Sequence, residues 1–386
     1  MTVLRVDVKP DLLRWARERS GLGIDTLTRR FPKLDTWEAG DAKPTFKQLE
    51  QFAHATHTPI GFLFLQTPPV EHFPIPDFRT KSGPRSDRPS PDLLETIYLC
   101  QHRQDWYRDF ARTRAEAPLS FVASASRSDD VVAVAARMRR TLGLDLEEQQ
   151  KERSWEGALR LLTERADAIG VLVMVSGIVG SNTHRPLDPD EFRGFALADP
   201  LAPLVFVNGA DTKAAQMFTL AHELAHIWLG ETAISDVDVA EAPRHTIERW
   251  CNQVAAELLV PLEVVRAEHK PKAGLLDEAQ RLARRFKVST LVILRRIQDT
   301  GAISQEKYWA AYRAELARLL ALPKATKSGG DFFATLGVRV GKSLAHALVV
   351  SALESTTTFT EAFRLLGIKK LSTFDSLAKR LGVDSS

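Results

Sequence analysis

Two histidines four positions apart, with a glutamate directly after the first, are the chemically most informative feature of the sequence. The segment reads His222-Glu223-Leu224-Ala225-His226. In an α-helix, positions i and i+4 share a face with Cβ atoms about 5–6 Å apart, so both imidazoles can bind one zinc ion. Glu223 is placed to take a proton from a water molecule that the zinc ion binds and acidifies. The spacing predicts a zinc-dependent hydrolytic site, and the alternative is a hydrogen-bonded polar stripe on a helix.

A catalytic zinc ion usually takes three protein ligands and keeps a fourth position open. Leu229 and Thr232 stand where an extended motif would place glycine and a third histidine, so the third ligand must come from downstream. Glu248 is the candidate in "RHTIERWCNQVAAELLVP", and Asn252, one turn later, can hydrogen-bond a ligand imidazole. Glu257 lies about half a turn round the helix from Glu248 and cannot face the same ion. The rival ligands are His245, Asp236 and Asp238.

The elements that must position these residues are visible as apolar patterns. Residues 171–179, 194–199 and 204–209 predict three strands, and the histidine motif then lies on a helix that begins at about residue 214. Glu248 lies on a second helix, predicted over 244–259. Further helices are predicted at about 91–115, 128–142, 152–169 and 276–322.

"FTLAHELAH" followed by "ERWCNQVAAELLVP" resembles the ImmA/IrrE metallopeptidases over about residues 155–262. The resemblance implies a small α/β zincin domain in which His222, His226 and Glu248 bind Zn²⁺ and Glu223 is the catalytic base. Family members of known role cleave transcriptional repressors, commonly of the Xre helix-turn-helix type. Long members with a fused helix-turn-helix-like module are often interpreted as regulators or as antitoxins of a toxin, including nucleases of the PIN type.

Such a module precedes the zinc motif in this chain. "LLRWARERSGLGIDTLTRRFPKLDTWEAGDAKPTFKQLEQFA" resembles the Xre (Cro/C1-type) pattern, but the turn and recognition helix are about one helical turn shorter than usual. Three interpretations stay open: sequence-specific DNA binding, protein–protein contact that includes mimicry of a repressor, and a structural cap. The candidate DNA contacts are Arg29, Arg30, Lys33, Asp35 and Thr36.

Residues 277–301 also have the spacing of two helices joined by a turn, with Ser289 as an N-cap. They form either a second helix-turn-helix or an ordinary helical hairpin that packs on the zinc domain, and the hairpin is the simpler interpretation. The arginines available for phosphate contact are Arg284, Arg285, Arg295 and Arg296.

Composition limits the classes of protein that fit. Hydrophobic residues make up 44% and charged residues 26% of the 386 residues, as in soluble globular proteins. The net charge of +3 excludes a strong global field, so any nucleic-acid-binding surface must be local. Two cysteines, Cys100 and Cys251, make no disulfide framework and fit a reducing compartment. Without a signal peptide or an apolar membrane span, we expect a cytoplasmic protein.

These observations predict a mainly α protein with a small α+β zincin domain and helical N-terminal and C-terminal domains. We expect a zinc endopeptidase that cleaves a protein substrate, such as a transcriptional repressor or other regulator. The alternative is a DNA-binding regulator or antitoxin whose zincin domain serves binding or sensing. Expected partners are a protein substrate or a co-encoded regulator or toxin, and double-stranded DNA if the N-terminal module reads it; a homodimer is compatible and no membrane is expected. The predicted boundaries are 1–66 (helix-turn-helix-like), 67–91 (proline-rich linker), 92–265 (helices and zinc domain), 266–325 (helices, with the second helix-turn-helix as one interpretation) and 326–386 (C-terminal helices).

Overall fold

The computed structural model describes residues 4–77, 89–235, 246–321 and 332–383. Contacts divide the chain into two compact units. Unit 1 comprises Met1–Pro74 and Ser82–Ile97, and unit 2 comprises Ile75–Lys81 and Tyr98–Ser386. Each unit is described by itself.

Unit 1 is a small helical bundle around its own apolar core. Its first helix ends at Gly21, whose positive φ of 66° suits a residue without Cβ. The fourth helix begins with a capping box, in which the Thr45 hydroxyl accepts from the Gln48 N–H and the Gln48 side chain accepts from the Thr45 N–H. The core centres on Trp37 and Phe52. The elements are α1 (Pro10–Ser20), α2 (Ile24–Arg30), α3 (Leu34–Ala39), α4 (Phe46–Ala55) and the 3₁₀ helix η1 (Ile60–Phe64).

Unit 2 is mainly helical and contains a four-stranded sheet. The strands are β1 (Leu172–Ser176), β2 (Gly194–Leu197), β3 (Leu204–Asn208) and β4 (Ala233–Ser235). The helices are α5 (Pro91–Thr113, from Tyr98 onward in this unit), α6 (Val131–Leu142), α7 (Leu146–Lys151), α8 (Trp155–Ala168), α9 (Lys213–Leu229), α10 (Thr246–Leu259), α11 (Leu262–Glu268), α12 (Leu275–Phe286), α13 (Thr290–Asp299), α14 (Gln305–Leu320), α15 (Phe332–Val340), α16 (Lys342–Leu353), α17 (Phe359–Leu366) and α18 (Leu371–Arg380).

The sheet has the strand order β1-β3-β2-β4, with β1 and β3 parallel and the other pairs antiparallel. The three predicted strands are confirmed and are shorter than predicted, whereas β4 was not foreseen. Every residue of the four strands is buried, which explains the continuous apolar runs in the sequence. One face contributes Val173, Val175, Val205 and Val207 to the main core with α8 and α9, while Met174 on the other face meets Cys100 of α5.

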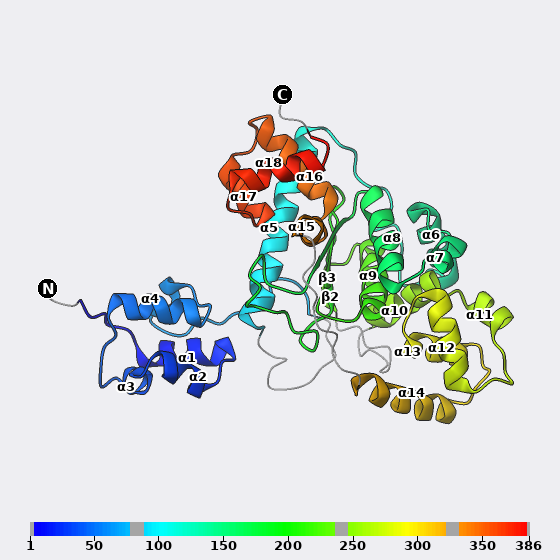
Figure 1. Ribbon diagram of the computed structural model, residues 1–386, viewed down its shortest axis with the longest axis horizontal. Helices are drawn as coiled ribbons and strands as arrows, with labels where there is room; N and C mark the ends of the chain where they lie inside the picture. Colours follow the sequence, from blue (N-terminus) through cyan, green and yellow to red (C-terminus); the bar gives the residue numbers. More distant parts are fainter. Residues whose placement is uncertain (1–3, 78–88, 236–245, 322–331, 384–386) are drawn as a thin grey trace. The chain divides into compact units, whose positions relative to one another are not determined.

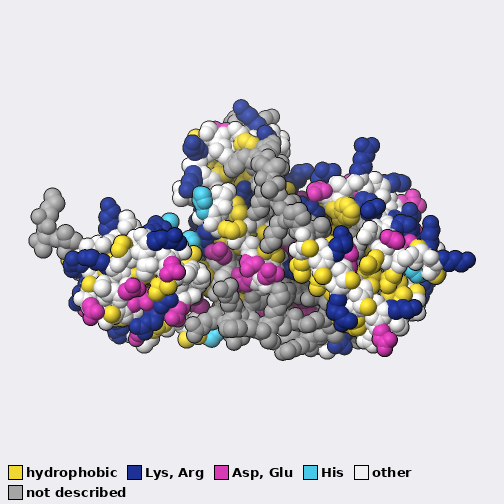
Figure 2. All heavy atoms as spheres, turned by 60° about the horizontal axis from the view of Figure 1, so that its bottom comes forward, with side chains coloured by type: hydrophobic (Ala, Val, Ile, Leu, Met, Phe, Trp, Pro, Cys, Tyr) yellow, Lys and Arg dark blue, Asp and Glu magenta, His cyan; other side chains and the backbone are white. Residues whose placement is uncertain are grey.

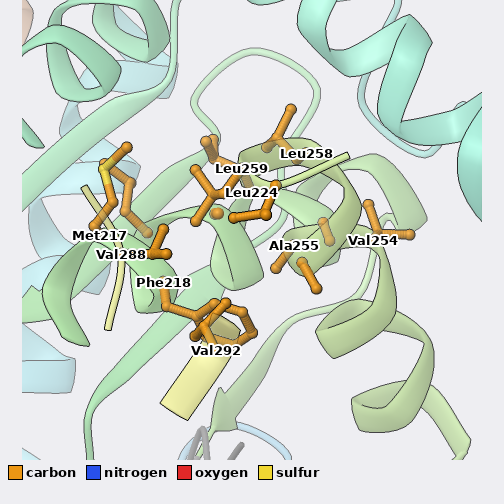
Figure 3. Close-up of a cluster of buried hydrophobic side chains, with 14 of the residues drawn as sticks. Met217, Phe218, Leu224, Val254, Ala255, Leu258, Leu259, Val288 and Val292 are labelled. Atoms are coloured by element: carbon orange, nitrogen blue, oxygen red, sulfur yellow. The ribbon is translucent and has the colours of Figure 1, made fainter. Parts of the chain in front are cut away.

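Helices α9 and α10 pack against each other beside β2 and β3 (Figure 1). The Thr212 hydroxyl caps α9 by accepting from the Ala215 N–H, and Gly230 ends the helix with a φ of 75°. A Cβ atom at Gly230 would lie 2.6 Å from the Ala123 Cβ, so close packing also requires glycine there. Figure 3 shows the cluster that fixes this pair. It contains Met217 and Leu224 of α9, Val254 and Leu258 of α10, Val288 of the turn between α12 and α13, and Val292 of α13.

The segment 277–301 forms an ordinary helical hairpin of α12 and α13. The Ser289 hydroxyl caps α13 by accepting from the Val292 N–H, as predicted. One side of α13 is buried, and Arg296 is itself buried in an ion pair with Glu257. Arg285 pairs with Glu268, and Arg295 pairs with Asp299. These contacts occupy three of the four arginines considered for phosphate contact and favour the packing role.

We expect unit 2 to be strongly destabilised when one partner of the Arg296–Glu257 ion pair is removed. Both side chains are buried, and Arg296 Nε also donates to the Val260 carbonyl oxygen at 2.9 Å. Arg296→Met leaves the Glu257 carboxylate buried without its cation and should lower the free energy of unfolding by about 3–5 kcal/mol. The control is Arg295→Met, whose exposed ion pair contributes about 0–1 kcal/mol. Chemical denaturation measures both variants, and equal losses would contradict the assignment.

The described surface is charged and of mixed sign. Lys, Arg, Asp and Glu side chains are interspersed on the face in Figure 2, in keeping with the small net charge. Within the ranges that the structure describes, no helix is both long enough and apolar enough to cross a bilayer.

Candidate metal centre

His222 and His226 of α9 meet Glu248 of α10 where the two helices pack together. Glu248 Oε2 lies 3.1 Å from His222 Nε2, and Glu248 Oε1 lies 3.0 Å from His226 Nε2. The two Nε2 atoms are 3.1 Å apart. Both histidines are completely buried, and Glu248 is 2% exposed. The structure therefore brings together the three side chains that the sequence nominated from separate helices.

This arrangement fits a zinc ion. Ligand atoms of a tetrahedral zinc site, each about 2.0–2.1 Å from the metal, lie roughly 3.3 Å from one another. The distance between the two Nε2 atoms and the two distances from Nε2 to a Glu248 oxygen are all close to that value. Two imidazoles and a carboxylate are also a donor set that catalytic zinc sites use. The three residues can thus hold a single ion with small adjustments of their side chains.

Asn252 orients one of the imidazoles. Its Oδ1 lies 2.9 Å from His222 Nδ1, on the side of the ring away from Glu248. When Nδ1 carries the proton and donates to Asn252, the lone pair of Nε2 is directed at the cluster. A hydrogen bond of this kind fixes both the tautomer and the ring orientation of a metal ligand.

We expect Asn252→Ala to weaken zinc binding by about 10–100-fold without removing a ligand, because His222 loses its orienting partner. Competition with a fluorescent chelator measures the change in affinity. The matched control is Gln253→Ala, which shortens an exposed side chain on the next position of α10. Equal zinc affinities of the two variants would show that Asn252 does not orient the ligand.

Glu223 is buried beside the cluster without the partners that a structural carboxylate would have. It is completely buried, and neither carboxylate oxygen has a hydrogen-bond partner among the described residues. Burial raises the pKa of Glu223 well above its usual value, the charge of Glu248 adds to the rise, and the nearby Ser235 hydroxyl partly offsets it. Buried polar groups are nearly always satisfied, so this exception argues against a hydrogen-bonded polar stripe and for a functional site.

The ionisation of the ligands suits metal binding. Burial opposes ionisation of Glu248, but His222 and His226 outweigh it and lower its pKa to about 2. Burial lowers the pKa of His226, although Glu248 opposes this. The carboxylate is therefore charged and the imidazole neutral at neutral pH, as coordination requires.

The sheet lies against the motif helix at Gly194, the first residue of β2. A Cβ atom there would lie 2.6 Å from Thr219 Cγ2 and 3.1 Å from Glu223 Oε1. Strand β4, which pairs with β2, contributes Ser235, whose Oγ is 3.3 Å from His226 Nε2. The centre is thus bounded by α9, α10 and the β2–β4 end of the sheet.

Two residues at this centre were not predicted. Ser235 lies on strand β4, which was not predicted because its sequence shows no periodic pattern. Cys251 Sγ lies within 4.8 Å of a nitrogen of each histidine, and its position three residues after Glu248 was a usable signal. Burial, with nearby carboxylates, raises the pKa of the Cys251 thiol well above its usual value. Glu248 approaches the histidines much more closely than 4.8 Å, which favours it over Cys251 as a third ligand.

The other nominated residues lie elsewhere. Glu257 forms an ion pair with Arg296, which agrees with the prediction that it does not face the same ion as Glu248. The rival ligands His245, Asp236 and Asp238 lie outside the described residues.

The candidate DNA contacts all belong to unit 1 and are all exposed. Arg29 and Arg30 end α2, Lys33 immediately precedes α3, and Asp35 and Thr36 lie on α3. Helix α3 spans only six residues, and its Leu34 and Trp37 are buried in the core of unit 1. The segment in which the sequence analysis placed a shortened recognition helix therefore forms a short, partly buried helix.

Comparison with known proteins points to the region that holds the metal centre. Residues 166–298 match the IrrE N-terminal-like domain, and residues 340–380 match a domain of unknown function. A stretch of 97 residues is 40% identical to the radiation response metalloprotease IrrE of Deinococcus radiodurans. That match covers 24% of this chain and 29% of the relative, so the similarity spans less than a third of the relative's length. The matched domain contains both histidines and Glu248, so the candidate metal centre lies in the part of this chain that is similar to the IrrE N-terminal-like domain.

Proposed function

We propose that this protein is a zinc-dependent endopeptidase in which Glu223 is the general base. The observation that carries the proposal is the completely buried Glu223 carboxylate, which has no hydrogen-bond partner among the described residues and lies beside three converging side chains. A binding or sensing role for the zinc cluster does not require such a carboxylate, and its burial costs folding free energy.

Each residue of the centre has a separate role in the proposed reaction. His222, His226 and Glu248 would hold the zinc ion, and Asn252 keeps the His222 ring in position. When bound, the ion supplies Lewis acidity that lowers the pKa of a water molecule and polarises a peptide carbonyl. Glu223 accepts a proton from the attacking water and returns it to the amine of the departing product.

We infer that the substrate is a specific protein, such as a transcriptional repressor or other regulator. The buried position of both histidines and Glu223 supports this inference, because such a centre does not meet solvent peptides freely. The family resemblance supports it as well, because relatives of known role act on repressors.

The test is cleavage of a defined regulator. The zinc-loaded chain is incubated with the regulator encoded beside its gene, and the products are identified by mass spectrometry. We expect one or a few specific cuts, loss of cleavage on chelation, and recovery when Zn²⁺ is added. Cleavage that survives complete zinc removal would contradict the proposal.

DNA contact by unit 1 is a second proposal, favoured by the exposed cations Arg29, Arg30 and Lys33 along the α2–α3 turn. The chain should shift its own promoter fragment in a salt-dependent manner, and the double variant Arg30→Ala and Lys33→Ala should weaken the shift. Equal binding by the double variant would exclude this surface.

A further inference from the structure

The outer edge of strand β4 is occupied by a distant segment of the same chain. Strand β4 ends the sheet order and pairs with β2 on one side. On its other side, the Ile234 N–H donates to the Pro76 carbonyl oxygen at 2.9 Å, and Asp77 pairs with Ile234 in a parallel bridge. We call residues 75–77 the docked segment. It belongs to unit 2 and is separated from β4 by more than 150 residues of sequence.

This edge borders the metal centre. Ile234 directly precedes Ser235, whose hydroxyl oxygen is 3.3 Å from His226 Nε2. The neighbouring strand carries Gly194, where an added Cβ atom would lie 3.1 Å from Glu223 Oε1. A peptide that lies along β4 therefore passes close to both the proposed base and a proposed ligand.

A free strand edge is a common docking place for an extended peptide, because its main-chain N–H and C=O groups are available for pairing. In this structure the Ile234 N–H already has an acceptor from within the chain. A substrate that added itself to β4 would need the same N–H.

The docked segment is anchored rather than loosely attached. Ile75 is only 6% exposed, whereas Val70, five residues earlier, is 78% exposed. Pro76 supplies a carbonyl acceptor but has no N–H, so the segment pairs with β4 without offering a full set of donors for another strand. Burial of Ile75 and the main-chain bond to Ile234 together hold the segment in place.

We propose that the docked segment occupies the edge on which the substrate main chain binds, and that it restrains the peptidase until it is displaced. This inference rests on the proposed function and adds its regulation. It assigns β4 as the substrate-binding strand. The substrate and the docked segment compete for the N–H of Ile234.

The test compares Ile75→Asp with Val70→Asp in the full zinc-loaded chain. The first variant places a charge at the buried anchor, and the second makes the same change at an exposed position. Hydrogen exchange measures the protection of the Ile234 amide, and cleavage of fluorescein-labelled casein measures activity. For Ile75→Asp we expect exchange at Ile234 and casein cleavage each to rise at least about tenfold, since a buried isoleucine side chain contributes on that order. For Val70→Asp we expect no change in either measurement.

A synthetic peptide of residues 70–80 should reverse the effect in the Ile75→Asp chain, and a scrambled peptide should not. If Ile75→Asp does not fold, Ile75→Ala removes part of the anchor without burying a charge and should give a smaller effect in the same direction.

The outcomes separate the two proposals. Unchanged exchange at Ile234 in both Ile75 variants would overturn the docking. Faster exchange in an Ile75 variant that cleaves casein or the co-encoded regulator no faster than the unsubstituted chain cleaves it would overturn the restraint alone. Faster exchange with no casein cleavage by any chain, and with the co-encoded regulator also left intact, would overturn the proposed function and the regulation that depends on it.

Discussion

Glu223→Gln should abolish hydrolysis while the chain keeps one zinc ion. The amide occupies nearly the same volume as the carboxylate, so the packing around this completely buried residue is retained. It cannot accept a proton from water, and loss of a general base lowers the rate by roughly 10²–10⁴-fold. Metal analysis and cleavage of the regulator, measured on the same preparation, test the two halves of the prediction. Glu263→Gln, at an exposed position, is the matched control and should change neither. Full activity of Glu223→Gln would show that Glu223 is not the general base.

The same substitution should stabilise the metal-free protein at neutral pH. The pKa of Glu223 is raised in the folded state, so the folded chain retains a proton that the unfolded chain releases. This group favours folding below the ordinary glutamate pKa, and its contribution is lost as the pH rises from there through the raised value. Glutamine has no such dependence. We expect Glu223→Gln to exceed the unsubstituted chain in free energy of unfolding by about 1–3 kcal/mol at pH 8, with a smaller difference at pH 5. His226, whose pKa is lowered, is common to both proteins and cancels in the comparison.

Glu248→Ala should remove zinc from the chain, whereas Cys251→Ala should keep it. Glu248 reaches both histidines at 3.0–3.1 Å, and its loss leaves two protein ligands. We expect the affinity to fall by more than the roughly 10–100-fold that loss of an orienting partner costs. Cys251 occupies the next turn of the same helix and is the alternative donor.

Zinc content after dialysis against a weak chelator distinguishes the two donors. The expected result is one ion per chain for Cys251→Ala and almost none for Glu248→Ala. The reverse pattern would show that Cys251, and not Glu248, is the third zinc ligand. Circular dichroism of both variants checks that the overall helix content is retained.

Helical periodicity explains why most of the centre could be predicted from the sequence. His222, Glu223 and His226 are placed relative to one another by one turn of helix. Glu248 and Asn252 are related in the same way, and the structure puts both on the side of α10 that faces His222. The half-turn offset of Glu257 likewise agrees with its pairing to Arg296. These relations are local, so the spacing of residues is enough to state them.

Contacts between distant segments account for what could not be predicted. Strand β4 has only three residues, too few for a recognisable pattern, and its place in the sheet is set by pairing with β2. Ser235 comes with that strand. The docked segment was assigned to a proline-rich linker, and nothing in its composition specifies that Pro76 meets Ile234. That Glu223 has no hydrogen-bond partner among the residues that the structure describes also depends on the packing around it rather than on its neighbours in sequence.

X-ray absorption spectroscopy at the zinc edge tests the central claim most directly, because it reports the atoms that surround the ion. His222, His226 and Glu248 predict a shell of nitrogen and oxygen atoms at about 2.0–2.2 Å, with imidazole scattering and no sulfur. A sulfur neighbour at about 2.3 Å, or a chain that binds no zinc, would contradict the account.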